Sequence, residues 1–114
     1  NSTGMITADE NGAVQLYHNG TSRFETSSTG ASLIGSLRSH GHVVPNADND
    51  VDLGTSSLRW RNVYTTDLQL SNEGSANDVD GTWGNWTIQE GESDLFLKNN
   101  RSGKKYKFNL TEVS

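Results

Sequence analysis

Short runs of alternating apolar and polar residues, separated by turn residues, make up much of the N-terminal third of the chain. Val14 and Leu16 fall on one side of such a run and the intervening Gln15 falls on the other, which is the period-two pattern of a half-buried strand. The run lies between Asn11-Gly12 and Asn19-Gly20, two pairs that favour tight hairpin turns. Turn residues recur about every eight to eleven residues, which predicts short antiparallel strands.

The last third of the chain shows the same pattern over three further strands. Their apolar positions are Trp86 and Ile88, then Leu95 and Leu97, then Tyr106, Phe108 and Leu110. Turn residues separate them at 90–92 and at 99–103. The pattern predicts an antiparallel meander with one apolar face. No window of the sequence combines the period of a helix with helix caps.

Residues 48–70 join an acidic turn to the densest group of large apolar side chains in the sequence. Trp60 and Tyr64 come close together among arginines, and Leu68 and Leu70 then alternate with polar residues. A segment this short cannot bury these four side chains against itself, so we expect other copies of the same chain to cover them. We assign Trp60, Tyr64, Leu68 and Leu70 to the core of a trimer.

The composition also favours association between chains. Only 31% of the 114 residues are hydrophobic, against roughly 45–50% in globular domains when glycine is counted as well. Asn, Ser and Thr together make up 37 residues. Because the scarce apolar residues fall in regular alternation, a core completed between chains explains them better than disorder does. The chain has no cysteine, so oligomerisation, not a disulfide, is the available way to stabilise a small fold.

Charge and the length of apolar runs exclude two kinds of partner. The net charge of −5 disfavours nucleic acid, whose binding needs clustered Lys and Arg. No apolar run approaches the ~20 residues of a transmembrane helix, so we expect no membrane insertion. The sequence does not begin with Met, and we expect it to be a fragment or a processed piece of a longer protein.

The sequence offers little for catalysis, and we expect no enzymatic activity. It has no Ser-His-Asp order, phosphate loop or nucleotide fingerprint. The carboxylates at 48–52 and 90–92 lie in a chain too short for a long glycan-cleaving groove. Asp48-x-Asp50-x-Asp52 has the start of a calcium loop, but Leu53 and Arg59 stand where that loop needs Gly and Glu. An exposed acidic turn is the better interpretation.

Aromatic side chains are candidates for binding sugars, because a ring offers an apolar face with a polar edge. Most of them are better explained as core. Trp83 differs, since it lies in the polar, Gly-bearing loop 72–84, and loops on a rigid β-scaffold commonly carry binding functions. We assign receptor binding to this loop and to the turn 99–104; the alternative is that the loop merely links two strands. The assigned residues are Trp83, Asn77, Asp80, Asn99, Asn100, Arg101 and Lys104.

Three stretches of the sequence resemble parts of bacteriophage fibres. Residues 52–64 read D-L-G-T-S-S-L-R-W-R-N-V-Y, which resembles a signature found near the C-terminal end of tail fibres and tailspikes of tailed phages. Residues 11–30 resemble a repeat of marine and cyanobacterial phage fibres, of which this chain has one copy. Residues 86–110 are similar, less specifically, to C-terminal segments of phage structural proteins.

The resemblance implies a structural and adhesive component of the virion, at the distal tail fibre. Its partner would be a glycan or outer-membrane receptor on the bacterial surface. The implied fold class is all-β, with short antiparallel strands in an intertwined homotrimeric fibre and a small C-terminal β-meander or sandwich cap. We expect a fibre-shaft β segment at 1–44, a trimerising segment at 45–71 and the cap at 72–114. Two other functions stay open: a small carbohydrate-binding module of a secreted enzyme, which predicts a monomer, and a virion decoration or baseplate protein, which predicts a different protein as partner.

A single glycine separates His40 from His42. Residues i and i+2 of a strand point to the same face, and in a three-fold fibre that face can point at the axis, where three chains supply six imidazole nitrogens. Six nitrogens suit an octahedral divalent ion such as Fe(II) or Ni(II) better than zinc, whose structural sites are tetrahedral. The resemblance adds that fibre tips of tailed phages use His-x-His pairs in this way. The alternative is two ordinary surface histidines beside a bend.

Overall fold

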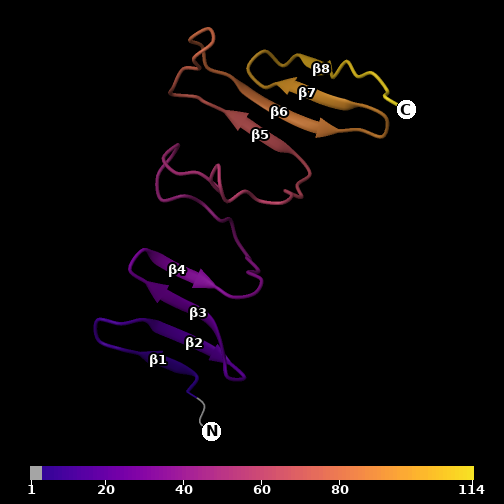
Figure 1. The fold of residues 1–114 in the computed structure, drawn as a ribbon. Helices are drawn as coiled ribbons and strands as arrows, with labels where there is room; N and C mark the ends of the chain where they lie inside the picture. Colours follow the sequence, from indigo (N-terminus) through magenta and orange to yellow (C-terminus); the bar gives the residue numbers. More distant parts are fainter. Residues whose placement is uncertain (1–3) are drawn as a thin grey trace. The chain divides into compact units, whose positions relative to one another are not determined.

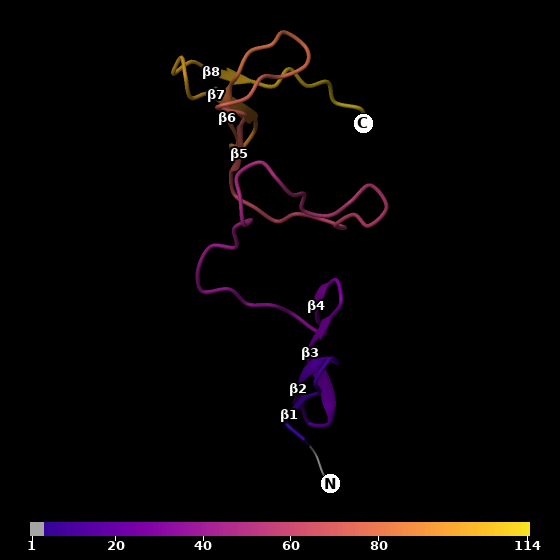
Figure 2. The same ribbon diagram turned by 90° about the vertical axis from the view of Figure 1, so that its left-hand side faces the viewer.

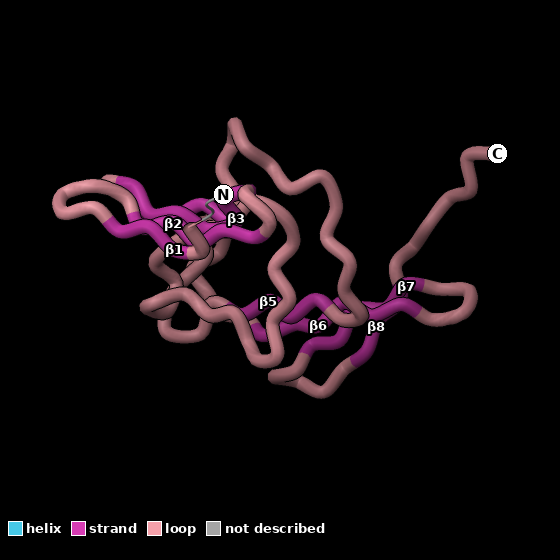
Figure 3. Tube along the Cα trace, turned by 90° about the horizontal axis from the view of Figure 1, so that it is seen from below, coloured by secondary structure: helices cyan, strands magenta, loops and turns pink. Residues whose placement is uncertain are grey.

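The computed structural model describes residues 4–114 and is built of strands and loops alone. Two compact units divide between Asp52 and Leu53, and each contains one four-stranded antiparallel sheet (Figure 1). The described residues include no helix, as the colouring of Figure 3 shows, and hence none that could span a membrane. The expectation of an all-β chain with short antiparallel strands is therefore confirmed.

The first sheet is a meander in which each strand pairs with the next along the chain. Its strands are β1 (Ile6–Ala8), β2 (Val14–His18), β3 (Thr21–Ser27) and β4 (Gly30–Leu33). Asn19 and Gly20 connect β2 to β3 with φ angles of 49° and 76°. Two consecutive positive φ angles define the turn whose twist matches a hairpin, so the hairpin predicted at Asn19-Gly20 is confirmed.

The strand register divides the first sheet into an apolar and a polar face. Ile6 lies opposite Leu16, Leu16 opposite Phe24, and Phe24 opposite Leu33. Because partners across a ladder point to the same side, these four residues form one continuous apolar face.

The other face of the first sheet carries linked polar side chains. Gln15 Nε2 donates to Glu25 Oε2 at 3.1 Å, and Tyr17 donates its hydroxyl proton to Gln15 Oε1 at 3.1 Å.

The second sheet repeats this two-faced arrangement. Its strands are β5 (Leu68–Ser71), β6 (Asn85–Glu90), β7 (Leu95–Asn99) and β8 (Lys105–Lys107), paired in that order. Leu68 lies opposite Ile88, Ile88 opposite Leu97, and Leu97 opposite Tyr106. Trp86, opposite Leu70, belongs to the same apolar face, and its ring centroid lies 6.0 Å from that of Tyr106.

Neither apolar face is buried. Each sheet, taken by itself, is a single layer of strands (Figure 2). The large side chains of the first sheet's apolar face, apart from the more exposed Ile6, are between 38% and 42% exposed, and Leu68, Leu70 and Tyr106 are each 46% exposed. No large hydrophobic residue in the described part of the chain is buried.

The one buried residue among those described is polar. Thr87 is 4% exposed and lies on the polar face of the second sheet, where its hydroxyl donates to Gln69 Oε1 at 2.7 Å and accepts from Asn100 Nδ2 at 2.9 Å. A buried hydroxyl needs such partners, since leaving it unpaired costs about 1–3 kcal/mol. Hydrogen bonding on the polar faces and strand pairing therefore hold a single chain together, without an apolar core.

The exposed surface of the chain is correspondingly large. It measures 10593 Å². A compact monomer of this length exposes roughly 6100 Å², and two separate compact domains the size of the two units would together expose roughly 7400 Å². The excess is thus about 3200 to 4500 Å² per chain, by the same scaling.

Residues 53–67 form a loop that contains no strand. Thr55 Oγ1 accepts from the Leu58 amide at 2.9 Å, and Thr55 N donates to Leu58 O at 2.9 Å. Gly54 has φ +84°, and a Cβ there would lie only 3.3 Å from Cδ1 of Trp60. The positive φ favours glycine, and a Cβ would be a tight fit beside the indole. Trp60 is 64% exposed and Tyr64 92% exposed in the single chain.

Two details differ from the sequence-based expectations. β5 pairs with β6, so residues 68–71 share a sheet with the C-terminal strands, whereas we had placed them in a separate segment ending at residue 71. Residues 34–50 form no strand, whereas the His40–His42 geometry assumed one. The described part of the intended 1–44 segment contains the first sheet, and residues 1–3 lie outside the described residues.

Candidate functional site

The second unit contains an open groove of about 1290 Å³. The loop 72–84 and the turn 99–104 both lie at the same end of the second sheet (Figure 1), and the groove is lined from both of them and from the end of β5. Five of the seven residues that we assigned to receptor binding line it. They are Asn77, Asp80, Trp83, Asn99 and Arg101.

Asn77 organises the loop 72–84 from within. Its Oδ1 accepts from the amides of Val79 at 2.8 Å and Asp80 at 2.9 Å, which is the usual asparagine turn. Its Nδ2 donates to Asp80 Oδ1 at 2.8 Å and to Thr82 O at 2.9 Å. The amide group is thus fully engaged within the loop, so Asn77 shapes the groove and has little left to offer a ligand.

Asp80 completes the same network. Its Oδ1 accepts from Thr82 Oγ1 at 2.7 Å and from the Thr82 amide at 3.1 Å. Hydrogen bonds from Thr82 and Asn77 favour the ionised form and lower the pKa of Asp80 below its ordinary value of 3.8. The carboxylate is therefore charged at neutral pH and serves as an acceptor that fixes the loop.

Asn72, which we did not assign to the site, closes the base of the loop. Its Oδ1 accepts from the Gly84 amide at 2.8 Å, and its Nδ2 donates to Thr82 O at 3.3 Å. Gly84 must be small, because a Cβ there would lie 2.9 Å from Nε1 of Trp86. A weak signal for this closure is present in the sequence, where Asn72 and Gly84 mark the two ends of the polar stretch.

Trp83 and Arg101 form the rim of the groove. The Arg101 guanidinium carbon lies 3.6 Å from the centroid of the Trp83 ring, and Arg101 Nη1 donates to Trp83 O at 2.8 Å. This cation–π contact and hydrogen bond tie the turn to the loop. Arg101 covers one face of the indole, and Trp83 also lines the groove. Trp83 is partly buried, whereas we expected an exposed ring.

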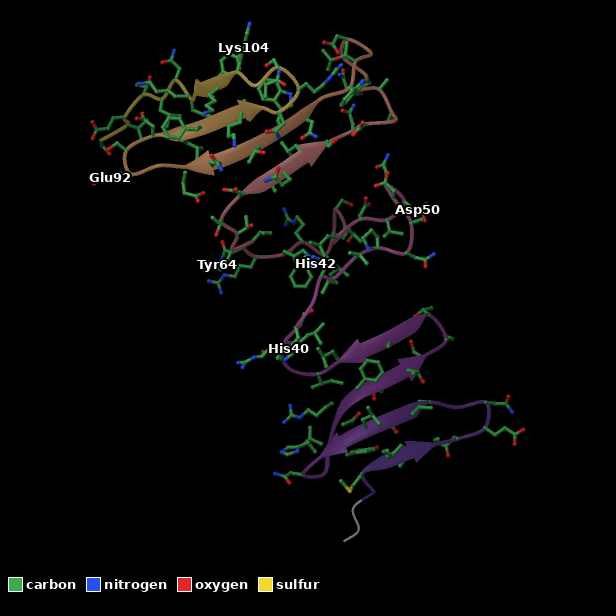
Figure 4. The ribbon with its side chains drawn as sticks, turned by 180° about the vertical axis from the view of Figure 1, so that it is seen from behind. His40, His42, Asp50, Tyr64, Glu92 and Lys104 are labelled. Carbon is green, nitrogen blue, oxygen red and sulfur yellow. The ribbon has the colours of Figure 1, made fainter. Side chains whose placement is uncertain are left out.

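The remaining assigned residues of the turn have different roles. Asn99 Oδ1 accepts from the amides of Arg101 at 3.0 Å and Ser102 at 3.2 Å, so it shapes the turn. Asn100 does not line the groove; its Nδ2 donates to Asn85 Oδ1 at 3.0 Å and to Thr87, which anchors the turn on β6. Lys104 also lies outside the groove lining and is exposed at the turn, as Figure 4 shows.

The groove lining combines aromatic surface with charged and polar groups. Trp83 provides aromatic surface, and Asp78 and Arg101 provide opposite charges at the lining, whereas Leu70 and Trp86, which also line the groove, belong to the apolar face of the sheet. Aromatic rings beside a few polar groups are suited to the apolar and hydroxyl-bearing faces of a sugar. Within the loop 72–84, the polar atoms of three side chains form hydrogen bonds mainly to the loop itself, which restricts its conformation in the absence of a ligand. These side chains are Asn72, Asn77 and Asp80.

His40 and His42 belong to the first unit, and neither is among the residues that line the groove. Both are exposed, and Figure 4 shows them on the irregular segment that follows β4. His40 and Gly41 form a bend in which the Gly41 amide donates to Ser39 Oγ at 3.3 Å, and Ser39 Oγ donates to Gly41 O. The argument that His40 and His42 point to the same face of a strand therefore no longer applies. Within residues 4–114 of one chain, no three His, Asp or Glu side chains gather as metal ligands.

Comparison of the chain with models of known protein families, with curated proteins and with solved structures finds no match.

Proposed function

We propose that this chain is a structural and adhesive part of a phage tail fibre, a homotrimeric tip on the distal fibre of the virion. The proposal rests on the resemblance of residues 11–30 and 52–64 to phage fibre sequences and on one structural observation. That observation is that each sheet has a continuous apolar face that nothing in its own unit covers. Exposed apolar faces of this kind mark surfaces that another molecule covers, and burying them against further copies of the chain is favourable.

The exposed area fits this association. In a cyclic trimer there are as many interfaces as chains, so an excess of about 3200 to 4500 Å² per chain corresponds to the same total area per interface. Obligate subunit interfaces bury about 2000 to 5000 Å². Association would also cover Trp60 and Tyr64, which we assign to the trimer core together with Leu68 and Leu70.

We place receptor binding in the groove of the second unit. Three chains would present three grooves, and several weak contacts to one cell surface add up to firm attachment. The receptor class that the groove suits is a surface glycan, because the lining offers the Trp83 indole beside polar groups.

A divalent ion such as Fe(II) or Ni(II) on the trimer axis is a further part of the proposal. His40 and His42 of one chain supply at most two ligands, so the other copies would have to supply the rest. Because the chain bends at His40 and Gly41, it would have to straighten there when the trimer forms.

Adsorption to cells tests the adhesive function. The labelled chain is mixed with a panel of bacteria that includes cyanobacteria, and the fraction bound is compared for Trp83→Ala and Val79→Ala. Val79 belongs to the same loop and is 91% exposed, but it does not line the groove, so its loss should leave adsorption unchanged. Trp83→Ala should reduce adsorption by roughly tenfold or more, since an aromatic anchor commonly contributes 2 kcal/mol or above.

Two results would contradict the proposal in different ways. Equal adsorption by Trp83→Ala and the unsubstituted chain, with the trimer intact, would remove the groove as the receptor site. A folded monomer that binds soluble glycans would instead favour a carbohydrate-binding module.

A further inference from the structure

Every lysine of the chain lies in the β7–β8 hairpin. Between Leu95 and Phe108 the sequence contains four lysines and Arg101 but no acidic residue, although the whole chain carries a net charge of −5. The hairpin is therefore a concentrated positive segment on an acidic protein. Lysines that serve solubility alone would be dispersed along the chain.

The register gathers three of these lysines on one face. Lys98 lies directly opposite Lys105, and Lys107 lies opposite Phe96. Because alternate residues of a strand share a face, Lys98, Lys105 and Lys107 all project from the polar face of the second sheet. Lys104 extends from the turn at the end of the same hairpin, whereas Glu92 lies at the other end of β7 (Figure 4).

This arrangement has an electrostatic cost within the chain. Like charges directly opposite each other on two strands repel. The only ion pair in the described residues joins Lys107 Nζ to Asp94 Oδ1 at 3.9 Å, between side chains that are 63% and 43% exposed, and an exposed pair at that distance contributes little. Lys98 and Lys105 have no carboxylate within ion-pairing distance in residues 4–114. An external anion would offset their repulsion.

We propose that the lysine face of the β7–β8 hairpin binds an acidic polysaccharide, with the sugar's carboxylate or phosphate groups between the lysines. This inference rests on the proposed adhesive function and names the class of its glycan. Arg101 connects the two surfaces, because it belongs to the same hairpin and also covers Trp83 at the groove. One polysaccharide chain can then contact an aromatic ring with its sugar faces and the lysines with its acidic groups.

Charge and geometry favour a polysaccharide over the other polyanions. The 14 acidic residues of the chain repel the dense phosphates of nucleic acid outside this one hairpin. The apolar face of the second sheet, which is the part of this sheet that would enter a lipid surface, is assigned to the trimer interior and lies on the side of the sheet away from these lysines.

Binding of polygalacturonate, a carboxylate polymer, to the full chain tests the inference. The variant Lys98→Gln/Lys105→Gln is compared with Arg38→Gln/Arg61→Gln, which removes the same net charge from exposed sites outside the hairpin. We expect the lysine variant to bind roughly 10- to 30-fold more weakly and the arginine variant to bind within about threefold of the unsubstituted chain. Added salt should weaken binding, and neutral dextran should not bind.

Each contrary result overturns the inference in its own way. Equal binding by the lysine variant would show that these lysines make no contact, and an equal loss in the arginine variant would show a mere effect of net charge. Tighter binding of single-stranded DNA or of anionic phospholipid vesicles would assign the face to another partner. If the chain adsorbs to cells but polygalacturonate and phosphorylated dextran both fail to bind, this inference falls while the adhesive function stands. If adsorption fails as well, both fall.

Discussion

Truncation of Leu70 to alanine should weaken the trimer measurably. Leu70 lies on the apolar face of the second sheet, opposite Trp86, and is 46% exposed in the single chain. That exposure corresponds to about 80 Å² of side-chain surface, which contributes about 2 kcal/mol when another chain covers it. Alanine retains about a third of this, so the loss is about 1.3 kcal/mol per chain and about 4 kcal/mol for three chains.

The loss can be read as a shift in the concentration at which the trimer dissociates. About 4 kcal/mol corresponds to a factor of about 10³ in the dissociation constant. Because that constant for a trimer scales with the square of the chain concentration, the midpoint should rise about 30-fold. Sedimentation velocity over a dilution series measures it, at one fixed concentration of guanidinium chloride if the parent trimer does not dissociate in buffer.

Lys105→Ala is the matched control, because Lys105 belongs to the same sheet but projects from its polar face. The chain concentration at which this variant is half dissociated should stay within about threefold of the parent value. If Leu70→Ala leaves the midpoint unchanged, or if both variants shift it equally, the assignment of the apolar face to the trimer interior is refuted.

Three further outcomes follow from individual residues. Gly54→Ala should destabilise the fold more than Gly74→Ala, by roughly 1 kcal/mol or more in a melting experiment: both glycines have φ near +85°, but only at Gly54 would the new Cβ meet a tryptophan ring. Since the pKa of Asp80 is lowered in the fold, the hydrogen bonds of its carboxylate stabilise the loop above pH 3.8 and are lost as pH falls through the lower folded pKa. The NMR signals of the loop amides should therefore shift in that pH range, and Asp80→Asn should abolish the shift. Elemental analysis should find about one divalent ion per three chains, and His40→Ala or His42→Ala should remove it. A metal-free trimer would mean that His40 and His42 are ordinary surface histidines.

The turns and strand faces could be predicted because they depend on neighbouring residues. Asn19-Gly20 specifies its hairpin through positive φ angles that few other pairs adopt. The alternation at Trp86 and Ile88 was enough to place both on one face, as the register with β5 and β7 confirms. Local chemistry thus determined most of the architecture within each sheet.

What could not be predicted depends on residues far apart in the sequence. The pairing of β5 with β6 bridges the loop 72–84, and its closure depends on Asn72 reaching Gly84. No local pattern indicates which strand a short apolar run will join. The bend at His40 was missed although its cause is local. The alternation of histidine with glycine is compatible with a strand, but the Ser39 hydroxyl accepts a hydrogen bond from the Gly41 amide and so favours a turn.

The meeting of the loop 72–84 and the turn 99–104 could be predicted better than the contacts that their individual residues make. The loop and the turn do meet in one groove, because both are connections at the same end of the sheet. However, Asn77 and Asn99 bind the backbone of their own loops, and composition alone cannot separate an asparagine that shapes a loop from one that contacts a ligand.

The mass of the chain in solution tests the central claim most directly, that the apolar faces of the two sheets are covered by other copies of this chain. At micromolar concentration, light scattering coupled to size exclusion should give three times the chain mass, with no folded monomer present. Because the chains must separate before they unfold, the same species should persist in detergent on an unheated gel. A monodisperse monomer that keeps its β-sheet circular dichroism would contradict the account.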